Sequence, residues 1–163
     1  MARRVFFSFH FERDHWRAGQ VRNSWVTRPD RQSAGFWDAV KWEAIKKQGD
    51  AAIKQWIRTH MKGTSVTVVL VGAETYSRKY VKYEIDQSLS QGNGLLAVRI
   101  HKLKDKNGYT DSRGPNPFDR LSVQVNNEKT LLSSLYSTYD WLDDDGYAKL
   151  GIWVEKAAKA VGR

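Results

Sequence analysis

The stretch that decides the fold is Thr64–Ile85, TSVTVVLVGAETYSRKYVKYEI, in which an apolar run is followed by a helical pattern. Val66–Val71 has the length and the β-branched content of a strand buried on both faces, and Gly72 marks its end. A helix is expected to begin near Ser77, whose side chain can cap it. The stretch therefore predicts a strand–helix unit of an α/β protein.

A single glutamate, Glu84, borders the inward face of this helix. Val81 and Ile85 belong to the inward stripe, and Glu84 follows Val81 by three residues. No helical neighbour of Glu84 is basic, whereas Asp86 has Lys82 one turn back as a surface partner. Open α/β sheets bind ligands near the carboxyl ends of their strands, so an unpaired carboxylate here is a candidate site residue. The alternative is an ordinary solvated position.

Length and composition fit one compact domain spanning residues 1–163, because the chain has 40% hydrophobic residues, no Pro/Gly/Ser-rich linker and no repeat. The absence of cysteine excludes disulfides and thiolate chemistry. The four histidines, His10, His15, His60 and His101, show no metal-ligand spacing, so no metal is expected. With no secretory signal and no apolar stretch of membrane-spanning length, we expect a cytoplasmic protein without a membrane partner.

The formal net charge of +9 raises the question of nucleic acid, since Lys and Arg bind phosphates. The basic residues are instead spread along the chain, over Arg3–Arg31, Lys41–Lys62, Arg78–Lys82 and Arg99–Lys106, and no recognised nucleic-acid motif is present. The distribution disfavours nucleic-acid binding. A positive cleft would still attract a phosphorylated small molecule.

The rest of the chain alternates strands and helices. Strands are expected at Arg4–Phe9 and Leu95–Ile100, with a short edge strand at Tyr136–Trp141; helices at Phe11–Trp25, Phe36–Lys47, from a cap at Asp50 to Gly63, and Tyr147–Val161; polar loops at Thr27–Gly35 and Lys102–Pro117; and an exposed acidic turn at Asp143–Asp145. This order predicts a flavodoxin-like α/β fold with a mostly parallel five-stranded sheet, helices on both faces and strand order 2-1-3-4-5.

In that topology the tip of the first strand, Ser8, Phe9 and His10, flanks the same crevice as Glu84. Ser8 and His10 are candidate hydrogen-bond donors to a ligand, although a turn hydroxyl and a loop histidine are the alternatives. No G-x-G-x-x-G or P-loop lysine motif is present to hold a dinucleotide in the usual way. The first strand also ends without the acidic residue that a receiver domain requires.

Several blocks of the sequence together carry a family resemblance. They are RVFFSFHFERD (4–14), VRNSWV (21–26), AGFWDAVKWE (34–43), the stretch quoted above and GNGLLAVRIHKLKD (92–105). These blocks resemble the TIR-like family that includes the TIR protein of the Thoeris anti-phage system. The resemblance covers about the first two thirds of the chain.

The resemblance implies a TIR fold and an enzyme that cleaves NAD at the nicotinamide ribosyl bond, with NAD as substrate and no cofactor. By motif, Glu84 takes the position of the family's catalytic glutamate. The implied product is a cyclic ADP-ribose type signal that activates a separate effector protein. Nicotinamide leaves without a general acid, so one carboxylate suffices to stabilise the oxocarbenium-like ribose.

Aromatic side chains near this position are candidates to stack on adenine or nicotinamide. They are Trp25, Phe36, Trp37 and Tyr80, and for each the alternative is a role in the core. The Thr27–Gly35 loop leaves self-association open. A noncatalytic TIR-like module that binds a partner protein or a nucleotide, with Glu84 in a purely architectural role, is the alternative function.

Overall fold

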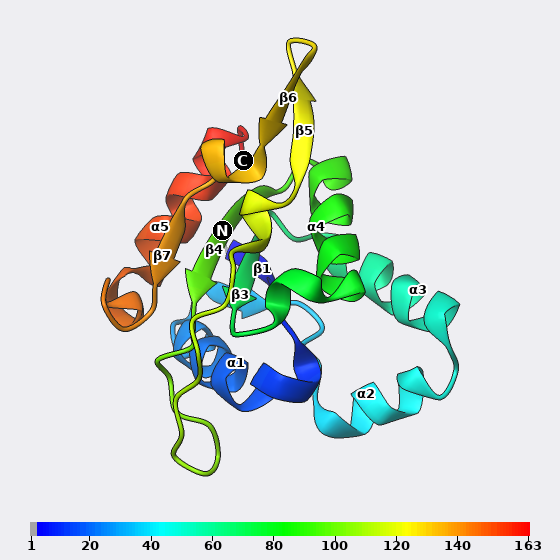
Figure 1. Cartoon of the computed structure of the whole chain (residues 1–163), viewed down its shortest axis with the longest axis vertical. Helices are drawn as coiled ribbons and strands as arrows, with labels where there is room; N and C mark the ends of the chain where they lie inside the picture. The colour runs from blue at the N-terminus through cyan, green and yellow to red at the C-terminus, as the bar shows by residue number, and fades with distance from the viewer. Residues whose placement is uncertain (1–2) are drawn as a thin grey trace.

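A five-stranded parallel sheet with strand order β2-β1-β3-β4-β7 forms the centre of the molecule (Figure 1). The computed structural model describes residues 3–163. The strands of this sheet are β1 (Arg3–Ser8), β2 (Arg31–Ser33), β3 (Val66–Val71), β4 (Gly94–Arg99) and β7 (Thr138–Asp140). The helices are α1 (Phe11–Val26), α2 (Ala39–Lys46), α3 (Asp50–Met61), α4 (Lys79–Gln91) and α5 (Gly146–Ala160). The predicted flavodoxin-like order is confirmed, with β7 as its fifth strand.

Strand β3 is buried along its whole length. Val66 and Leu70 belong to one hydrophobic cluster, while Val69 and Val71 belong to a second cluster. Because successive side chains of a strand point to opposite faces, the two clusters lie on opposite faces of the sheet. The predicted burial of this strand on both faces is therefore confirmed.

The helices are divided between the two faces of the sheet. Helix α1 contacts α5, and α3 contacts α4, which packs on β3 and β1 (Figure 1). This division follows from right-handed crossovers between parallel strands, which place helices on opposite faces when the direction of strand addition reverses. Along α4, Glu84 contacts Ser8 at the carboxyl end of β1, and Ser88 contacts Thr67 near the start of β3.

The edge strand β2 lies within Thr27–Gly35, which the sequence predicts to be a loop, so that prediction was wrong. Residues 31–33 pair in parallel with residues 3–5 at the start of β1. The strand is only three residues long and polar, so it lacks the apolar alternation by which a strand is recognised.

Two predicted helix caps were also wrong. Ser77 lies in a 3₁₀ turn, Thr75–Ser77, where its hydroxyl donates to the Glu74 carbonyl at 3.0 Å, and α4 begins two residues later without a side-chain cap. Asp50 is the first residue of α3, and the capping position is Gly49, whose φ of 98° is favourable only for glycine. In both cases a backbone turn, rather than a side-chain oxygen, sets the start of the helix.

A hairpin that the sequence analysis did not predict projects from the sheet region (Figure 1). Strands β5 (Ser122–Val125) and β6 (Glu128–Leu131) pair in antiparallel fashion. Asn126 and Asn127 connect them with φ values of 51° and 66°, the left-handed pair typical of a two-residue hairpin turn. The Asn-Asn dipeptide is the signal that was available in the sequence.

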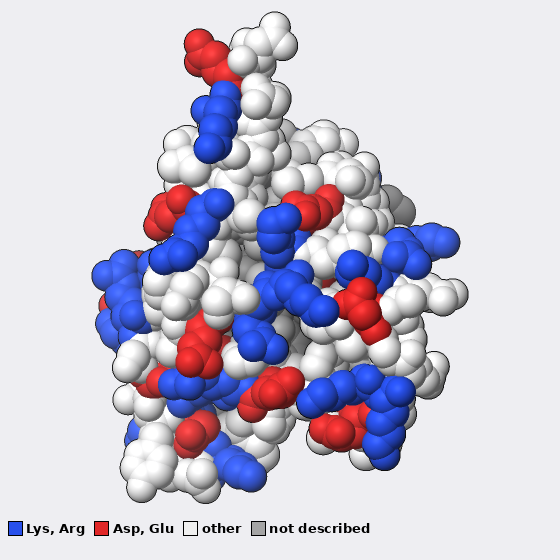
Figure 2. Space-filling model, turned by 45° about the vertical axis from the view of Figure 1, so that its right-hand side comes forward, with Lys and Arg blue, Asp and Glu red and all other residues white. Residues whose placement is uncertain are grey.

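On the face seen in Figure 2, Lys and Arg gather near the middle and lie among Asp and Glu elsewhere. Within residues 3–163, no helix has the length and apolar character needed to cross a membrane. The same part of the chain contains no group of three or more His, Asp or Glu side chains placed to hold a metal ion.

Candidate active site

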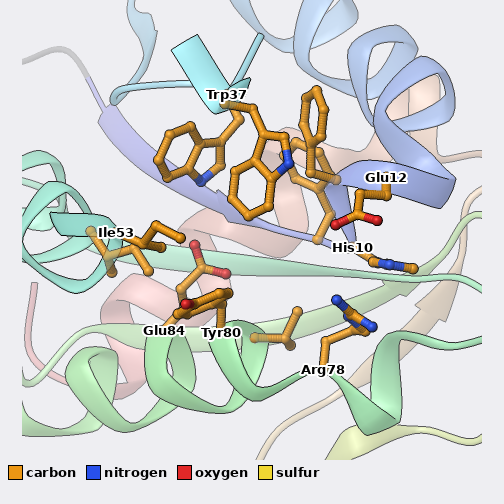
Figure 3. Close-up of a pocket in the computed structure, with 12 residues that line it drawn as sticks. His10, Glu12, Trp37, Ile53, Arg78, Tyr80 and Glu84 are labelled. Atoms are coloured by element: carbon orange, nitrogen blue, oxygen red, sulfur yellow. The ribbon is translucent and has the colours of Figure 1, made fainter. Parts of the chain in front are cut away.

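A narrow pocket lies at the carboxyl end of β1, bordered by α3 and α4 (Figure 3). Its interior volume is about 20 Å³, roughly the space that one water molecule needs. Its lining comes from four segments: Phe9, His10, Phe11 and Glu12 after β1, Trp37 and Trp42 around the start of α2, Ile53 and Ile57 on α3, and Arg78, Tyr80, Val81 and Glu84 at the start of α4.

Glu84 points into this pocket and is only 2% exposed (Figure 3). The Ser8 hydroxyl, at the end of β1, donates a hydrogen bond of 2.7 Å to Glu84 Oε1. Within residues 3–163 the Glu84 carboxylate forms no ion pair, whereas Asp86 pairs with Lys82 at 3.4 Å. The expectation that Glu84 lacks a cationic partner and that Asp86 takes one is confirmed.

Burial raises the pKa of Glu84 to about 8, and the hydrogen bond from Ser8 opposes this rise only in part. At pH 7 the carboxyl group is therefore mostly protonated when nothing charged lies beside it. A positive charge placed in the pocket favours the ionised form. The charge state of Glu84 thus depends on what occupies the pocket.

Stacked and edge-on aromatic rings form one wall of the pocket. The Trp37 indole stacks on Trp56 with ring centroids 3.5 Å apart and meets Trp42 edge-on at 5.1 Å. Trp42 in turn stacks on Phe11 at 5.3 Å and meets Tyr80 edge-on at 6.4 Å. Such a wall keeps water away from Glu84 and offers flat apolar surfaces to a planar ring.

Tyr80 is held in place through Asp50 at the start of α3. The Tyr80 hydroxyl donates to Asp50 Oδ1 at 2.8 Å, and Asp50 also pairs with Lys79 at 3.0 Å and with Lys54 at 3.3 Å. Hydrogen bonds from Lys79, Tyr80 and Lys54 lower the pKa of Asp50. These contacts join the first turns of α3 and α4, which carry opposite sides of the pocket.

His10, Glu12 and Arg78 lie together at one end of the pocket (Figure 3). His10 is 7% exposed, and burial, followed by the positive charge of Arg78, lowers its pKa, so it is neutral at pH 7. Arg78 is exposed and forms no ion pair within residues 3–163. This end of the pocket therefore presents a free guanidinium to an anionic group.

The structure brings together most of the residues that the sequence singles out. Phe9, His10, Trp37, Tyr80 and Glu84 line the pocket. Ser8 contacts it only through its hydrogen bond to Glu84.

Trp25 and Phe36 do not line the pocket. Trp25 is buried in the core, where its indole nitrogen donates to the Gln32 carbonyl at 2.9 Å and the Arg31 guanidinium lies 4.6 Å from its ring centroid. Phe36 stacks behind Phe9 at 5.0 Å. Their placement fits the core alternative for Trp25 and a supporting role for Phe36.

Seven lining residues were not predicted as site residues, and they are Phe11, Glu12, Trp42, Ile53, Ile57, Arg78 and Val81. Trp42 lies in the same AGFWDAVKWE block as Trp37 and follows it by five residues, a spacing that does not place two side chains on one face of a helix. The two rings can still meet because Trp37 lies before α2 and does not follow the helical repeat. A local sequence pattern does not predict this contact.

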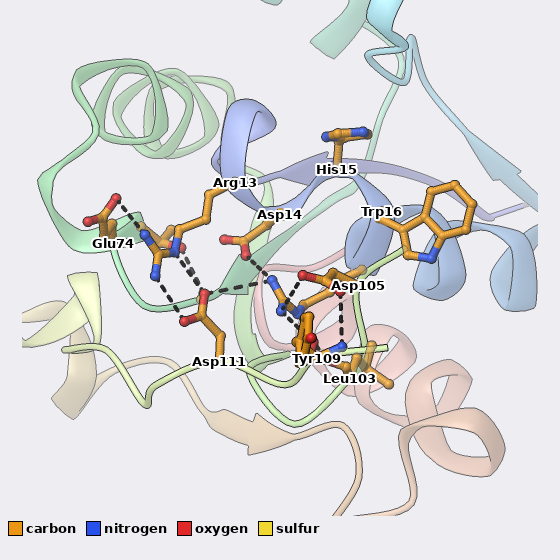
Figure 4. A network of polar contacts seen from close by, with 12 residues as sticks. Arg13, Asp14, His15, Trp16, Glu74, Leu103, Asp105, Tyr109 and Asp111 are labelled. Atoms are coloured by element: carbon orange, nitrogen blue, oxygen red, sulfur yellow. Dashed lines mark hydrogen bonds and ion pairs between the residues drawn. The ribbon is translucent and has the colours of Figure 1, made fainter. Parts of the chain in front are cut away.

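Beside the pocket, a polar network fastens the long loop after β4 to α1 (Figure 4). Arg17 donates to the carbonyl oxygens of Leu103 and Tyr109, both at 2.8 Å. Arg13 holds Asp111 with two hydrogen bonds of 2.7 and 2.9 Å. Because such paired bonds fix both distance and orientation, the loop is set firmly against the helix.

Asp14 is the buried carboxylate of this network. It is fully buried, and Arg17 Nη1 lies 3.3 Å from its Oδ1. Burial raises the pKa of Asp14 to about 6, against the lowering effect of the Arg17 charge. A Cβ added at Gly72, at the end of β3, would lie 2.2 Å from Asp14 Oδ2, so the close approach of this carboxylate requires glycine there.

Two comparisons with known proteins bear on this site. Residues 6–105 match the family described as "Thoeris protein ThsB, TIR-like domain". ThsB1 of Bacillus cereus strain MSX-D12, which is provisionally named a cyclic ADP-D-ribose synthase, is 39% identical over 191 aligned positions that cover 94% of this chain and 100% of that protein. The family match begins within β1, at residue 6, and includes β2, β3, β4 and the whole pocket lining.

Proposed function

Because this chain belongs to the family of Thoeris ThsB TIR-like domains, we propose that it cleaves NAD at the nicotinamide ribosyl bond and forms a cyclic ADP-ribose type signal. NAD is then the substrate and no further cofactor takes part. The signal activates a separate effector protein, and self-association of the chain belongs to the same proposal. The observation that carries it is the buried Glu84, which lines an aromatic pocket and forms no ion pair within the described residues.

The proposed reaction breaks the bond between C1′ of the ribose and the nicotinamide nitrogen. The bonding electrons go to the positively charged ring, which leaves as neutral nicotinamide, so the leaving group needs no proton. Positive charge develops on the ribose as an oxocarbenium ion. The Glu84 carboxylate stabilises this charge, and the low-dielectric surroundings strengthen the attraction.

The raised pKa of Glu84 supports a coupling between substrate binding and ionisation. Its pKa of about 8 keeps the group mostly neutral at pH 7, which limits the cost of burying it. The cationic nicotinamide ring favours the carboxylate form when it enters the pocket. Binding of NAD is therefore accompanied by loss of the Glu84 proton, and the charge appears where the reaction needs it.

Capture of the ribosyl centre decides between a cyclic product and simple hydrolysis. A hydroxyl of the ADP-ribose moiety forms the new bond to C1′ and gives up its proton, for which Glu84 is a suitable acceptor. Exclusion of water by Trp37, Trp42 and Tyr80 favours this internal nucleophile. Since the pocket holds only about 20 Å³, the aromatic side chains must shift to admit a nicotinamide ring.

The test is the NAD-derived product. Extracts of phage-challenged cells that express the chain, and the purified protein, are incubated with NAD and analysed by mass spectrometry. We expect a cyclic ADP-ribose type product from the native chain, none from Glu84→Gln, and an undiminished amount from Asp86→Asn, which alters an exposed carboxylate on the same helix. If challenged extracts contain no product that depends on Glu84, the enzymatic proposal fails and a noncatalytic module is left.

A further inference from the structure

A second pocket lies at the carboxyl ends of β4 and β7, on the other side of β3 from β1. Its volume is about 480 Å³, within the range of small-molecule sites. It shares no lining residue with the Glu84 pocket, being lined by Arg99, His101, Lys102, Arg113, Asn116, Thr138, Tyr139, Asp140, Asp143 and Asp144.

The carboxylates of this pocket already have partners within the protein. Asp140 Oδ1 accepts hydrogen bonds from the backbone nitrogens of Leu142 and Asp143, both at 3.0 Å. The Asp144 carboxylate accepts from the Asp140 nitrogen at 2.7 Å, and Asp143 pairs with Lys102. The predicted exposed turn at residues 143–145 thus also forms one side of a pocket. Its carboxylate oxygens already accept from neighbouring backbone nitrogens or pair with Lys102.

The two arginines of this pocket are in a different situation. Arg99 makes one hydrogen bond, to the Gly114 carbonyl at 2.7 Å, and within residues 3–163 neither Arg99 nor the exposed Arg113 forms an ion pair. Both arginines line the same pocket. Burial, followed by the positive charge of Arg113, lowers the pKa of Arg99, and the negative charges of Asp119 and Asp140 oppose this.

His101 gives a second, independent sign of unused polar capacity. It is 7% exposed, and its Nδ1 is buried without a hydrogen-bond partner in the described part of the chain. Buried polar atoms are normally paired, so an orphan in a pocket lining indicates a missing partner. Two guanidinium groups and an imidazole therefore line a pocket whose three carboxylates, on Asp140, Asp143 and Asp144, are already held by backbone nitrogens or by Lys102.

We propose that this second pocket binds a phosphoryl group of a nucleotide. The planar guanidinium groups of two arginines can each donate paired hydrogen bonds to phosphate oxygens. An anion bound between Arg99 and Arg113 would also offset the repulsion between their positive charges. Strand β3 lies between the two pockets. Beside the end of β3, Arg13 pairs with both Glu74 and Asp111. This arrangement favours a nucleotide other than the NAD molecule being cleaved, although the pyrophosphate of that NAD has the same chemistry.

The test measures binding rather than turnover, so it does not depend on the proposed function. Inorganic pyrophosphate and ADP are titrated by calorimetry into the full chain carrying Glu84→Gln, which removes the proposed catalytic group. We expect both to bind, and Arg113→Gln to weaken the binding about tenfold or more by removing a charge-assisted contact. Lys106→Gln, which removes an exposed charge from the same loop outside the pocket, is expected to leave the affinity unchanged.

Absence of binding up to millimolar concentrations overturns the inference. An equal loss in Lys106→Gln also overturns it, because the attraction would then come from overall charge. To identify the source of the phosphoryl group, binding of NAD is measured with saturating pyrophosphate. Simultaneous binding supports a separate nucleotide, whereas competition that disappears in Arg113→Gln supports the phosphates of NAD itself.

Discussion

The Glu84 pocket and the Asp14 network are two regions where a carboxylate is buried, and they differ in what surrounds the charge. Glu84 is 2% exposed and receives one hydroxyl hydrogen bond, whereas Asp14 is fully buried and has the Arg17 guanidinium 3.3 Å away. Burial raises the pKa of both, to about 8 for Glu84 and about 6 for Asp14. The difference in pKa agrees with the difference in partners.

Burial of a carboxylate costs free energy at both positions, but the two buried groups have different roles. Asp14 uses its charge internally, because Arg17 also holds the carbonyls of Leu103 and Tyr109 and so ties the loop after β4 to α1. Glu84 has no cationic partner among residues 3–163, so its charge is available to a ligand. Buried carboxylates with an internal cation therefore indicate a structural role, and those without one indicate a binding or catalytic role.

The largest expected effect separates the two carboxylates by activity. Under conditions in which the native chain makes product, Glu84→Gln is expected to reduce the rate by about 10³-fold, because the transition-state charge loses its stabilising group. Asp14→Asn is expected to retain the activity of its folded fraction. Rates are measured from NAD loss by chromatography, and a matching loss in the two folded variants would break the distinction.

Stability should show the reverse order. Asp14→Asn leaves the buried Arg17 without its carboxylate and is expected to lower the free energy of unfolding by roughly 3 kcal/mol, the lower range for a broken buried ion pair, since two carbonyls still hold Arg17. Glu84→Gln removes no ion pair and should not destabilise the protein. Urea unfolding measures both values, and equal destabilisation would contradict the assigned roles.

The pH dependence of the reaction tests the charge state of Glu84. Its pKa of about 8 leaves the free enzyme mostly protonated below that pH, so kcat/KM should rise about tenfold per pH unit from pH 6 to 8 and level off above. A profile that is flat between pH 6 and 8 would show that the carboxylate is already ionised in the free enzyme.

Ser8→Ala should produce a smaller loss. The Ser8 hydrogen bond lowers the pKa of Glu84, so its removal is expected to decrease kcat/KM about tenfold at pH 7 and to move the profile to higher pH. Ser8→Thr, which keeps the hydroxyl, is the matched variant. A tenfold loss with an unmoved profile would mean that Ser8 positions the substrate rather than the carboxylate.

A further prediction concerns stability as a function of pH. A carboxyl group with a raised pKa binds more protons in the folded state, so stability is fully present below the unfolded pKa and is lost as pH rises through the folded value. For Glu84 this loss runs from 4.5 to about 8. For Asp14 it runs from 3.8 to about 6.

Glu84→Gln should therefore remove the decline of stability above pH 6 and leave below pH 6 only the part that is due to Asp14. Thermal unfolding at several pH values measures this, and each kcal/mol of difference between the variants corresponds to about 2–4 °C for a chain of this size. If the decline above pH 6 persists in Glu84→Gln, another group is responsible for it.

Much of the fold was predictable because its main elements have local signatures. The apolar run of β3 and the helical period around Val81 and Ile85 predicted both elements, and their alternation with other strands predicted the sheet order. The edge strand β2 and the hairpin of β5 and β6 escaped because they are short and polar or half exposed, so they carry little apolar periodicity.

The site was predicted only in part. Glu84, Ser8 and the tip of β1 could be placed together since topology fixes which strand ends meet. Trp42 and Phe11 could not, because their approach depends on how the segment before α2 folds over the sheet.

The sequence alone determined the strand–helix unit, the order of the sheet and the absence of a helical partner for Glu84, because these depend on residues close together along the chain. The tertiary structure decided that the Glu84 carboxylate is buried, that Ser8 is its hydrogen-bond donor and that Arg99 and Arg113 line one pocket without an ion pair within residues 3–163. Desolvation and charge–charge contacts depend on all neighbours in space, and most of those neighbours are distant in sequence.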